Sequence, residues 1–115
     1  MSNKRVPTPS KIGISKERYM ELYYFCLQYK EYEKIYSSGV CEGAETAYNR
    51  MEMILKAAIE TDMELAPYII ESVTTKTKFE HLDFPCGRRK FFELRRKFFR
   101  ALHLIQFYNV DFDLL

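Results

Sequence analysis

Apolar side chains recur every three or four residues along most of this 115-residue chain, and that spacing is the period of an amphipathic α-helix. The pattern predicts helices over residues 16–36, 44–60, 65–73, 78–82 and 88–108. No run of residues alternates apolar and polar side chains as a half-buried strand would, and no segment repeats. We therefore expect an all-α fold, in the form of a four- to five-helix domain.

The apolar stripe of each predicted helix identifies the side chains that we expect in the core. Ser, Gly, Thr and Pro mark the breaks between the helices, because these residues favour caps and turns over helix interiors. The expected core positions are Tyr19, Leu22, Cys26 and Tyr29, flanked by Phe25, Tyr32 and Tyr36; Ala47, Met51, Ile54, Leu55, Ala58 and Ile59; Leu65, Tyr68, Ile69 and Val73; and Phe91, Leu94, Phe98, Leu102 and Ile105.

The chain divides into three segments by composition. Residues 1–13 are polar, include Pro7 and Pro9, and are expected to form a disordered arm. Residues 14–108 hold every predicted helix and form a single helical domain, large enough to bury a core of its own. Residues 109–115 are an acidic and apolar tail, which we expect either to dock on the domain or to contact a partner.

Charge is concentrated in one stretch. Residues 88–100, RRKFFELRRKFFR, carry seven Lys or Arg and one Glu, a formal charge of +6. The other 102 residues carry eleven basic and fifteen acidic side chains, a formal charge of −4. The net charge of +2 therefore hides one strongly basic helix on a near-neutral or acidic body. Such a helix attracts phosphate through Coulomb forces and counterion release, although basic stretches also occur as plain solvated surface.

The position of the basic helix is a second indication of function, beside its charge. It follows the short predicted helix 78–82 and the breaker Phe-Pro-Cys-Gly at 84–87, which is the outline of a helix-turn-helix over about 76–107. In that motif the first residues of the second helix meet base edges and the outer residues hold phosphates. The candidates for base contact are Arg88, Arg89, Lys90 and Glu93, and those for phosphate contact are Arg96, Lys97 and Arg100.

Two phenylalanines lie beside the core stripe of this helix. Phe92 and Phe99 share a side of the helical wheel with Arg88 and Arg95. They either pack against tyrosines of the first helix or form a dimer or partner surface with Arg–aromatic stacking. Phe112, in the tail, is a third candidate for such a protein interface.

Nothing in the sequence favours an enzyme. His81 and His103 have no metal-binding spacing, so we expect no metal ion. Cys86 has only His81 as a nearby base, and four glycines form no phosphate-binding loop, so we expect no cofactor and no small-molecule substrate. Three unpaired cysteines favour free thiols in a reducing cytoplasm, and no run of 18 apolar residues predicts a membrane span.

Four further stretches of the sequence are informative together: residues 70–74 (IESVT), 79–82 (FEHL), 84–99 (FPCGRRKFFELRRKFF) and 15–29 (SKERYMELYYFCLQY). On these residues the C-terminal third resembles small phage and prophage proteins of Firmicutes, and residues 15–29 look like the first helix of those proteins. The resemblance covers about residues 14–102. The end of those proteins is similar in layout to the helix-turn-helix of sigma-factor region 4 and of phage late-gene transcriptional regulators. The resemblance therefore implies a phage-derived role in DNA binding or transcription.

We accordingly expect a phage-type protein that binds duplex DNA and regulates transcription in the nucleoid of a bacterial cytoplasm. Because one such motif binds weakly, the expected partners are a second copy of the chain in a homodimer, RNA polymerase or another protein. The alternative is a phage protein that uses the basic and aromatic helix to inhibit or modulate a host protein or nucleoprotein complex. Salt-sensitive binding to duplex DNA distinguishes the two.

Overall fold

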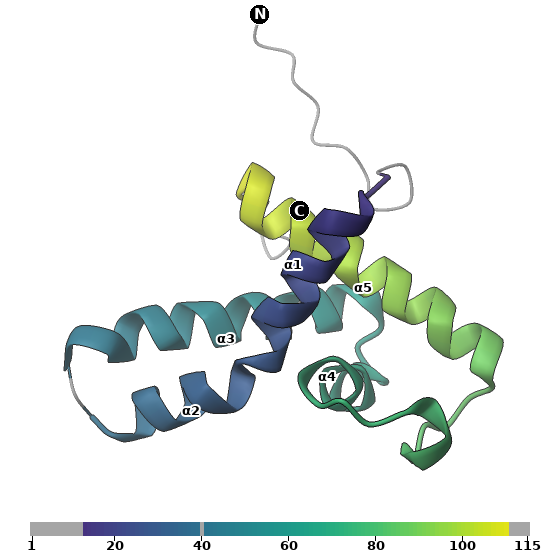
Figure 1. Ribbon diagram of the computed structural model, residues 1–115, viewed down its shortest axis with the longest axis horizontal. Coiled ribbons are helices and arrows are strands. Elements are labelled where there is room, and N and C mark those ends of the chain that lie inside the picture. Colours follow the sequence, from purple (N-terminus) through teal and green to yellow (C-terminus); the bar gives the residue numbers. More distant parts are fainter. Residues whose placement is uncertain (1–12, 40, 111–115) are drawn as a thin grey trace, which may run out of the picture.

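The computed structural model describes residues 13–39 and 41–110, and over this part of the chain the fold is all-α, as predicted. Most of the expected arm 1–13 and of the tail 109–115, including Phe112, lies outside the described residues. The helices, in order, are α1 (Lys16–Leu27), α2 (Tyr29–Ser37), α3 (Cys41–Thr61), α4 (Ala66–Thr74), the 3-10 helix η2 (Phe79–His81) and α5 (Arg88–Tyr108) (Figure 1).

The single helix expected over 16–36 is wrong, because the chain bends at Gln28. Ser15 caps the start of α1, where its hydroxyl accepts from the Arg18 N–H at 3.1 Å. Gln28 leaves the helical region (φ −88°, ψ 6°), and α2 then continues in a new direction beside α3 (Figure 1). The bend buries Tyr32 against Ala47 and Met51 in a small second core. Tertiary packing therefore overrides a continuous helical pattern.

The core forms where α5 crosses the other helices. The five apolar positions predicted for α5 are all buried, and Phe98 and Leu102 have no exposed surface. Four of the five pack in one cluster with Leu22 and Cys26 of α1 and with residues of α3 and α4, whereas Phe91 contacts the rings of Phe79 and Phe84. This part of the pattern is confirmed, and it directs the opposite side of α5 to the solvent.

Four expected core positions are wrong, and the first of them is Tyr36 of α2, which is 50% exposed. Leu55 is 39% exposed and Ile59 is 47% exposed, whereas Ala57, absent from the expected stripe, is fully buried. The small side chains of Ala57 and Ala58 lie in the cluster that contains α5, so the buried face of α3 is rotated from the expected one. Tyr68 is 38% exposed and makes an edge contact with Phe84 at 6.1 Å between ring centroids.

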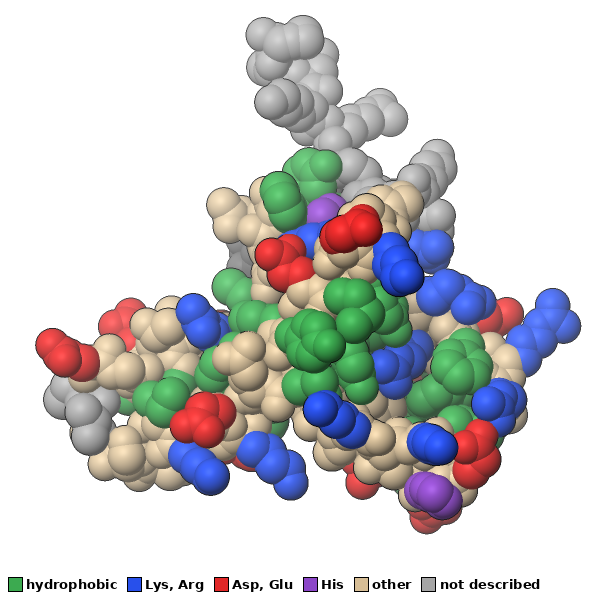
Figure 2. Space-filling model, viewed as in Figure 1, with side chains coloured by type: hydrophobic (Ala, Val, Ile, Leu, Met, Phe, Trp, Pro, Cys, Tyr) green, Lys and Arg blue, Asp and Glu red, His purple; other side chains and the backbone are tan. Residues whose placement is uncertain are grey.

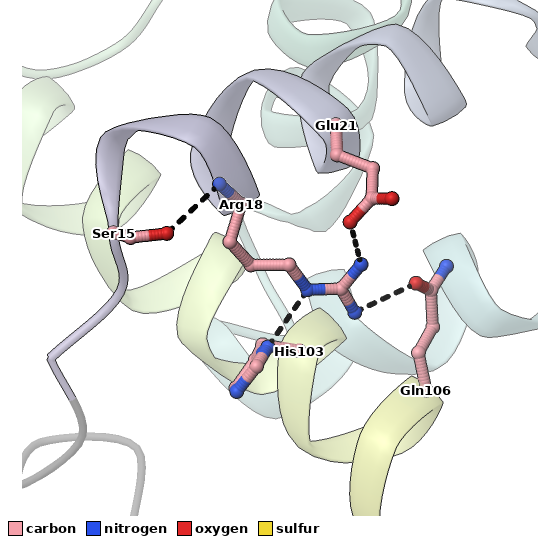
Figure 3. Close-up of polar contacts among 5 residues, drawn as sticks. All are labelled: Ser15, Arg18, Glu21, His103 and Gln106. Carbon is pink, nitrogen blue, oxygen red and sulfur yellow. Dashed lines mark hydrogen bonds and ion pairs between the residues drawn. The ribbon is translucent and has the colours of Figure 1, made fainter.

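A hydrogen-bonded group ties the start of α1 to the end of α5 (Figure 3). The Arg18 guanidinium donates to His103 Nδ1 at 2.9 Å, to Gln106 Oε1 at 2.9 Å and to Glu21 Oε1 at 2.6 Å. It also lies 4.8 Å from the centroid of the Phe107 ring. Only 14% of the Arg18 side chain is exposed, so this arginine has a structural role and links α1 to α5.

Candidate nucleic-acid interface

The segment before α5 is not the helix that the sequence suggested. The helix expected over 78–82 is a single 3-10 turn, η2, and the chain on either side of it is irregular. Aromatic packing holds the segment instead: Phe79 and Phe84 lie 4.9 Å and 4.8 Å from the buried Phe91 ring, centroid to centroid. The helix-turn-helix expected over 76–107 is therefore not confirmed, and its second helix, α5, is the part that is present.

The N-terminal half of α5 presents its cations on the side opposite the core. Arg89, Lys90, Arg96 and Lys97 are exposed and Arg100 is half-buried, and we call these five residues the basic face. Lys and Arg side chains gather over this end of the molecule in Figure 2. At 1.5 Å per residue, the basic face extends over about 17 Å of helix.

The basic face borders an open cavity of about 440 Å³. Arg96, Lys97 and Arg100 line it from α5, together with Glu93, and Glu60 lines it from the last turn of α3. Three cations thus meet two carboxylates. The structure brings together the predicted phosphate contacts and also supplies an acidic neighbour, Glu60, from a part of the chain that sequence spacing does not relate to α5.

Arg88 is separated from the basic face. Its guanidinium forms an ion pair with Glu80 of η2 and lies 5.8 Å and 5.7 Å from the ring centroids of Phe79 and Phe92. The hydrogen bond from Arg88 lowers the pKa of the Glu80 carboxyl. Of the four predicted base contacts, Arg89, Lys90 and Glu93 are thus exposed together, while Arg88 lies against the linker.

Arg95 is an important residue that the sequence analysis did not include among the sites. It donates from Nη1 to the Ser72 carbonyl at 3.2 Å and from Nε to the Tyr19 hydroxyl at 3.4 Å. It also lies 5.1 Å from the Tyr23 ring centroid. The position of Arg95 beside the apolar stripe of α5 is the feature of the sequence that could have identified it as a contact residue.

Arg95 also affects a buried thiol. Burial raises the pKa of the neighbouring Cys26 thiol to about 12, an effect that the charge of Arg95 partly offsets.

The predicted protein interface is wrong at one of its three residues, Phe99. Phe99 has no exposed surface, because it packs against Tyr19 at 4.7 Å and Tyr23 at 6.4 Å between ring centroids. It is a core residue, which is the first of the two alternatives considered above. Phe92 is 38% exposed and remains available, and Phe112 lies outside the described residues.

Two general features of the described residues bear on the chemistry. No group of three His, Cys, Asp or Glu side chains in residues 13–39 and 41–110 is placed to hold a metal ion. No helix within the same residues has the length and apolar character needed to cross a membrane. His81 is exposed near the start of α5, whereas His103 belongs to the Arg18 group at the opposite end.

Comparison of this chain with protein-family models, with curated proteins and with solved structures found no match.

Proposed function

We propose that this chain binds duplex DNA through the basic face of α5 and that it acts in transcription control in a bacterial cytoplasm. The observation that carries the proposal is the placement of the charge. Seven cations and one carboxylate occupy residues 88–100, and five of these cations form the basic face on the side of α5 opposite the core. A surface of this kind lowers its free energy by displacing the counterions of a phosphate backbone.

The start of α5 supports the same proposal. Its first turn carries Arg88, Arg89 and Lys90 and no acidic residue, and its N-cap, Gly87, offers no side chain to the free N–H groups. Cations at this end oppose the helix dipole and reduce stability, whereas an anion there is stabilised by the dipole. A local arrangement that disfavours folding is typical of a functional site. A phosphate at this position would offset the unfavourable charge.

The resemblance to small phage proteins supports the finer part of the proposal, a role in transcription. Since a single helix on DNA binds weakly, we propose that a second copy of the chain or RNA polymerase completes the complex. The alternative, inhibition or modulation of a host protein, loses part of its support because Phe99 is in the core. Phe92 is the aromatic side chain of that surface that stays accessible.

The test is fluorescence anisotropy with random-sequence duplex DNA at two salt concentrations. The wild type is expected to bind, and its affinity is expected to fall steeply with salt. The variant Arg89→Glu/Arg96→Glu should bind far more weakly at low salt, and the slope of log affinity against log salt should flatten by about two, one for each lost contact.

The matched control is Lys30→Glu/Lys34→Glu, which makes the same change in net charge on exposed residues of α2. It should keep most of the affinity, because its charges are outside the basic face. No binding at low salt would refute the proposal. An equal loss in both double variants would also refute it, since net charge rather than the basic face would then explain the binding.

A further inference from the structure

A second recess lies next to the basic face, and its lining differs from that of the first. It is a groove of about 500 Å³ between α1, the linker 75–87 and the first turns of α5. We call it the aromatic groove. Its lining includes Tyr19, Lys78, Phe79, Arg88, Phe92 and Arg95. Its volume is within the range of sites that hold small molecules or single side groups, about 300–1,000 Å³.

The buried Phe91 ring holds the aromatic rings of the groove in place. Phe91 is buried, and its ring lies 4.9 Å from Phe79 on the linker and 4.9 Å from Phe92 on α5, centroid to centroid. The rings of Phe91 and Phe92 meet at 75°, an edge contact. Phe92 nevertheless keeps 38% of its surface exposed. A preorganised and accessible ring is suited to stacking, because little conformational entropy is lost when a ligand binds.

Positive charge surrounds these rings. Lys78 is exposed, 62% of the Arg88 side chain is exposed, and Arg95 is half-buried. Glu80 is the carboxylate that lines the groove, and Arg88 already pairs with it. The groove therefore carries an excess of two positive charges. A ligand that suits it brings an aromatic face together with negative charge.

The groove also adjoins the proposed DNA surface. Phe92 is four residues before Arg96 and three after Arg89, so the side chains of all three are neighbours on the surface of α5. A backbone that follows the basic face would reach the groove within one helical turn. Its phosphates would meet the cations of the basic face, and an unpaired base would meet the exposed Phe92 ring. An acidic peptide would pair with the cations, but its carboxylates would offer no π face to the Phe92 ring.

We propose that the aromatic groove binds an unpaired nucleotide, with its base stacked on Phe92 and its phosphate held by Lys78 and Arg88. The proposal rests on the proposed function, because it extends the duplex contact of the basic face to an adjoining single strand. Stacking of a base on an aromatic side chain and contact with a basic groove are the usual means of binding single strands without sequence preference. The protein would then prefer a duplex that ends in unpaired nucleotides over a blunt one.

The test compares anisotropy for a blunt duplex, the same duplex with a short oligothymidine overhang, and the same duplex with an oligouridine overhang. The wild type should bind the overhangs more tightly than the blunt end, and the two overhangs show whether the groove distinguishes DNA from RNA. Phe92→Ala should remove the gain, a loss of about fivefold or more, and should leave the blunt duplex unaffected. Phe92→Tyr should keep the gain, since it keeps the ring.

The control is Phe107→Ala. Phe107 is also an exposed phenylalanine of α5 beside an arginine, but it lies at the opposite end of the helix, 4.8 Å from Arg18. It should keep the gain from the overhang. Lys78→Glu, a change of an exposed linker residue, should lower affinity for the overhang and flatten its salt slope by about one. This second variant tests the groove even if Phe92→Ala proves unstable in a thermal melt.

The outcomes separate the two proposals. Equal affinity for blunt and overhanging duplexes, or a gain that persists in Phe92→Ala, overturns the proposal that the aromatic groove binds a nucleotide. Neither result affects the proposal that the basic face binds duplex DNA. Binding of the single strand that depends on Phe92, without any binding of the blunt duplex, supports the groove and overturns the duplex proposal. Absence of binding to every nucleic acid overturns both.

Discussion

The two halves of α5 differ strongly in charge. Residues 88–100 carry seven cations, whereas residues 101–108, ALHLIQFY, carry no Asp, Glu, Lys or Arg. Both halves contribute to the same core, through Leu94 and Phe98 in the first half and Leu102 and Ile105 in the second. One helix thus combines a charged outer surface at its start with a neutral, tightly held end.

Each half has an Arg–Phe pair, and the two pairs show what the difference means. Arg18 beside Phe107 is 14% exposed and donates to three side chains, so its hydrogen-bonding groups are used within the fold. Arg88 beside Phe92 is 62% exposed and pairs with Glu80 alone among the described contacts of its side-chain nitrogens. The same pair of residue types is therefore structural at one end, and accessible to a ligand at the other.

The largest expected effect tests whether the two halves share one core. Phe98 lies near the middle of α5 and is fully buried. Phe98→Ala should lower the free energy of unfolding by about 3–5 kcal/mol, because it removes a large apolar side chain and leaves a cavity. Urea denaturation followed by circular dichroism measures this, and both halves should unfold in one transition. Two separate transitions would contradict the shared core.

The next effect separates the structural arginine from a surface one. Arg18→Met keeps most of the apolar stem but leaves His103 and Gln106 without their donor, so we expect a loss of about 1–3 kcal/mol in unfolding free energy. Arg96→Met, on the exposed basic face, should change stability by no more than about 0.5 kcal/mol. DNA affinity should show the opposite order, with a larger loss in Arg96→Met than in Arg18→Met. Similar destabilisation by both variants would remove the distinction between the two ends of α5.

The smallest effect is a pH dependence at the neutral end. Burial, and then the charge of Arg18, lower the pKa of His103 in the folded protein. The unfolded chain, with an imidazole pKa of about 6.5, therefore binds more protons than the folded one just below that pH. Stability should be complete above about pH 6.5 and should fall as the pH drops below it. Urea midpoints at pH 7.5 and pH 5.5 measure the change, above the range in which most carboxylates titrate.

The control for this effect uses the other histidine. His103→Gln offers Arg18 an amide oxygen that does not titrate, and the pH dependence should become smaller. His81→Gln changes an exposed residue near the opposite end of α5, and the pH dependence of stability should stay as in the wild type. An unchanged pH profile in His103→Gln would show that the Arg18 group is not its source.

The sequence alone determined the helical class, the boundaries of α5 and the side of α5 that enters the core. These features depend on local propensity and on a regular apolar period within one segment, which a reader of the sequence can follow directly. The concentration of charge at residues 88–100 was equally visible, because charge is a property of composition.

Only the tertiary structure decided which of two equivalent side chains is covered. Phe92 and Phe99 occupy the same side of α5, yet Tyr19 and Tyr23 of α1 bury Phe99 and leave Phe92 exposed. In the same way, Gln28 bends because α2 packs on α3, and the linker 75–87 folds around Phe91 rather than into a helix. Such outcomes depend on contacts between segments far apart in the chain, and neither local propensity nor periodicity contains that information.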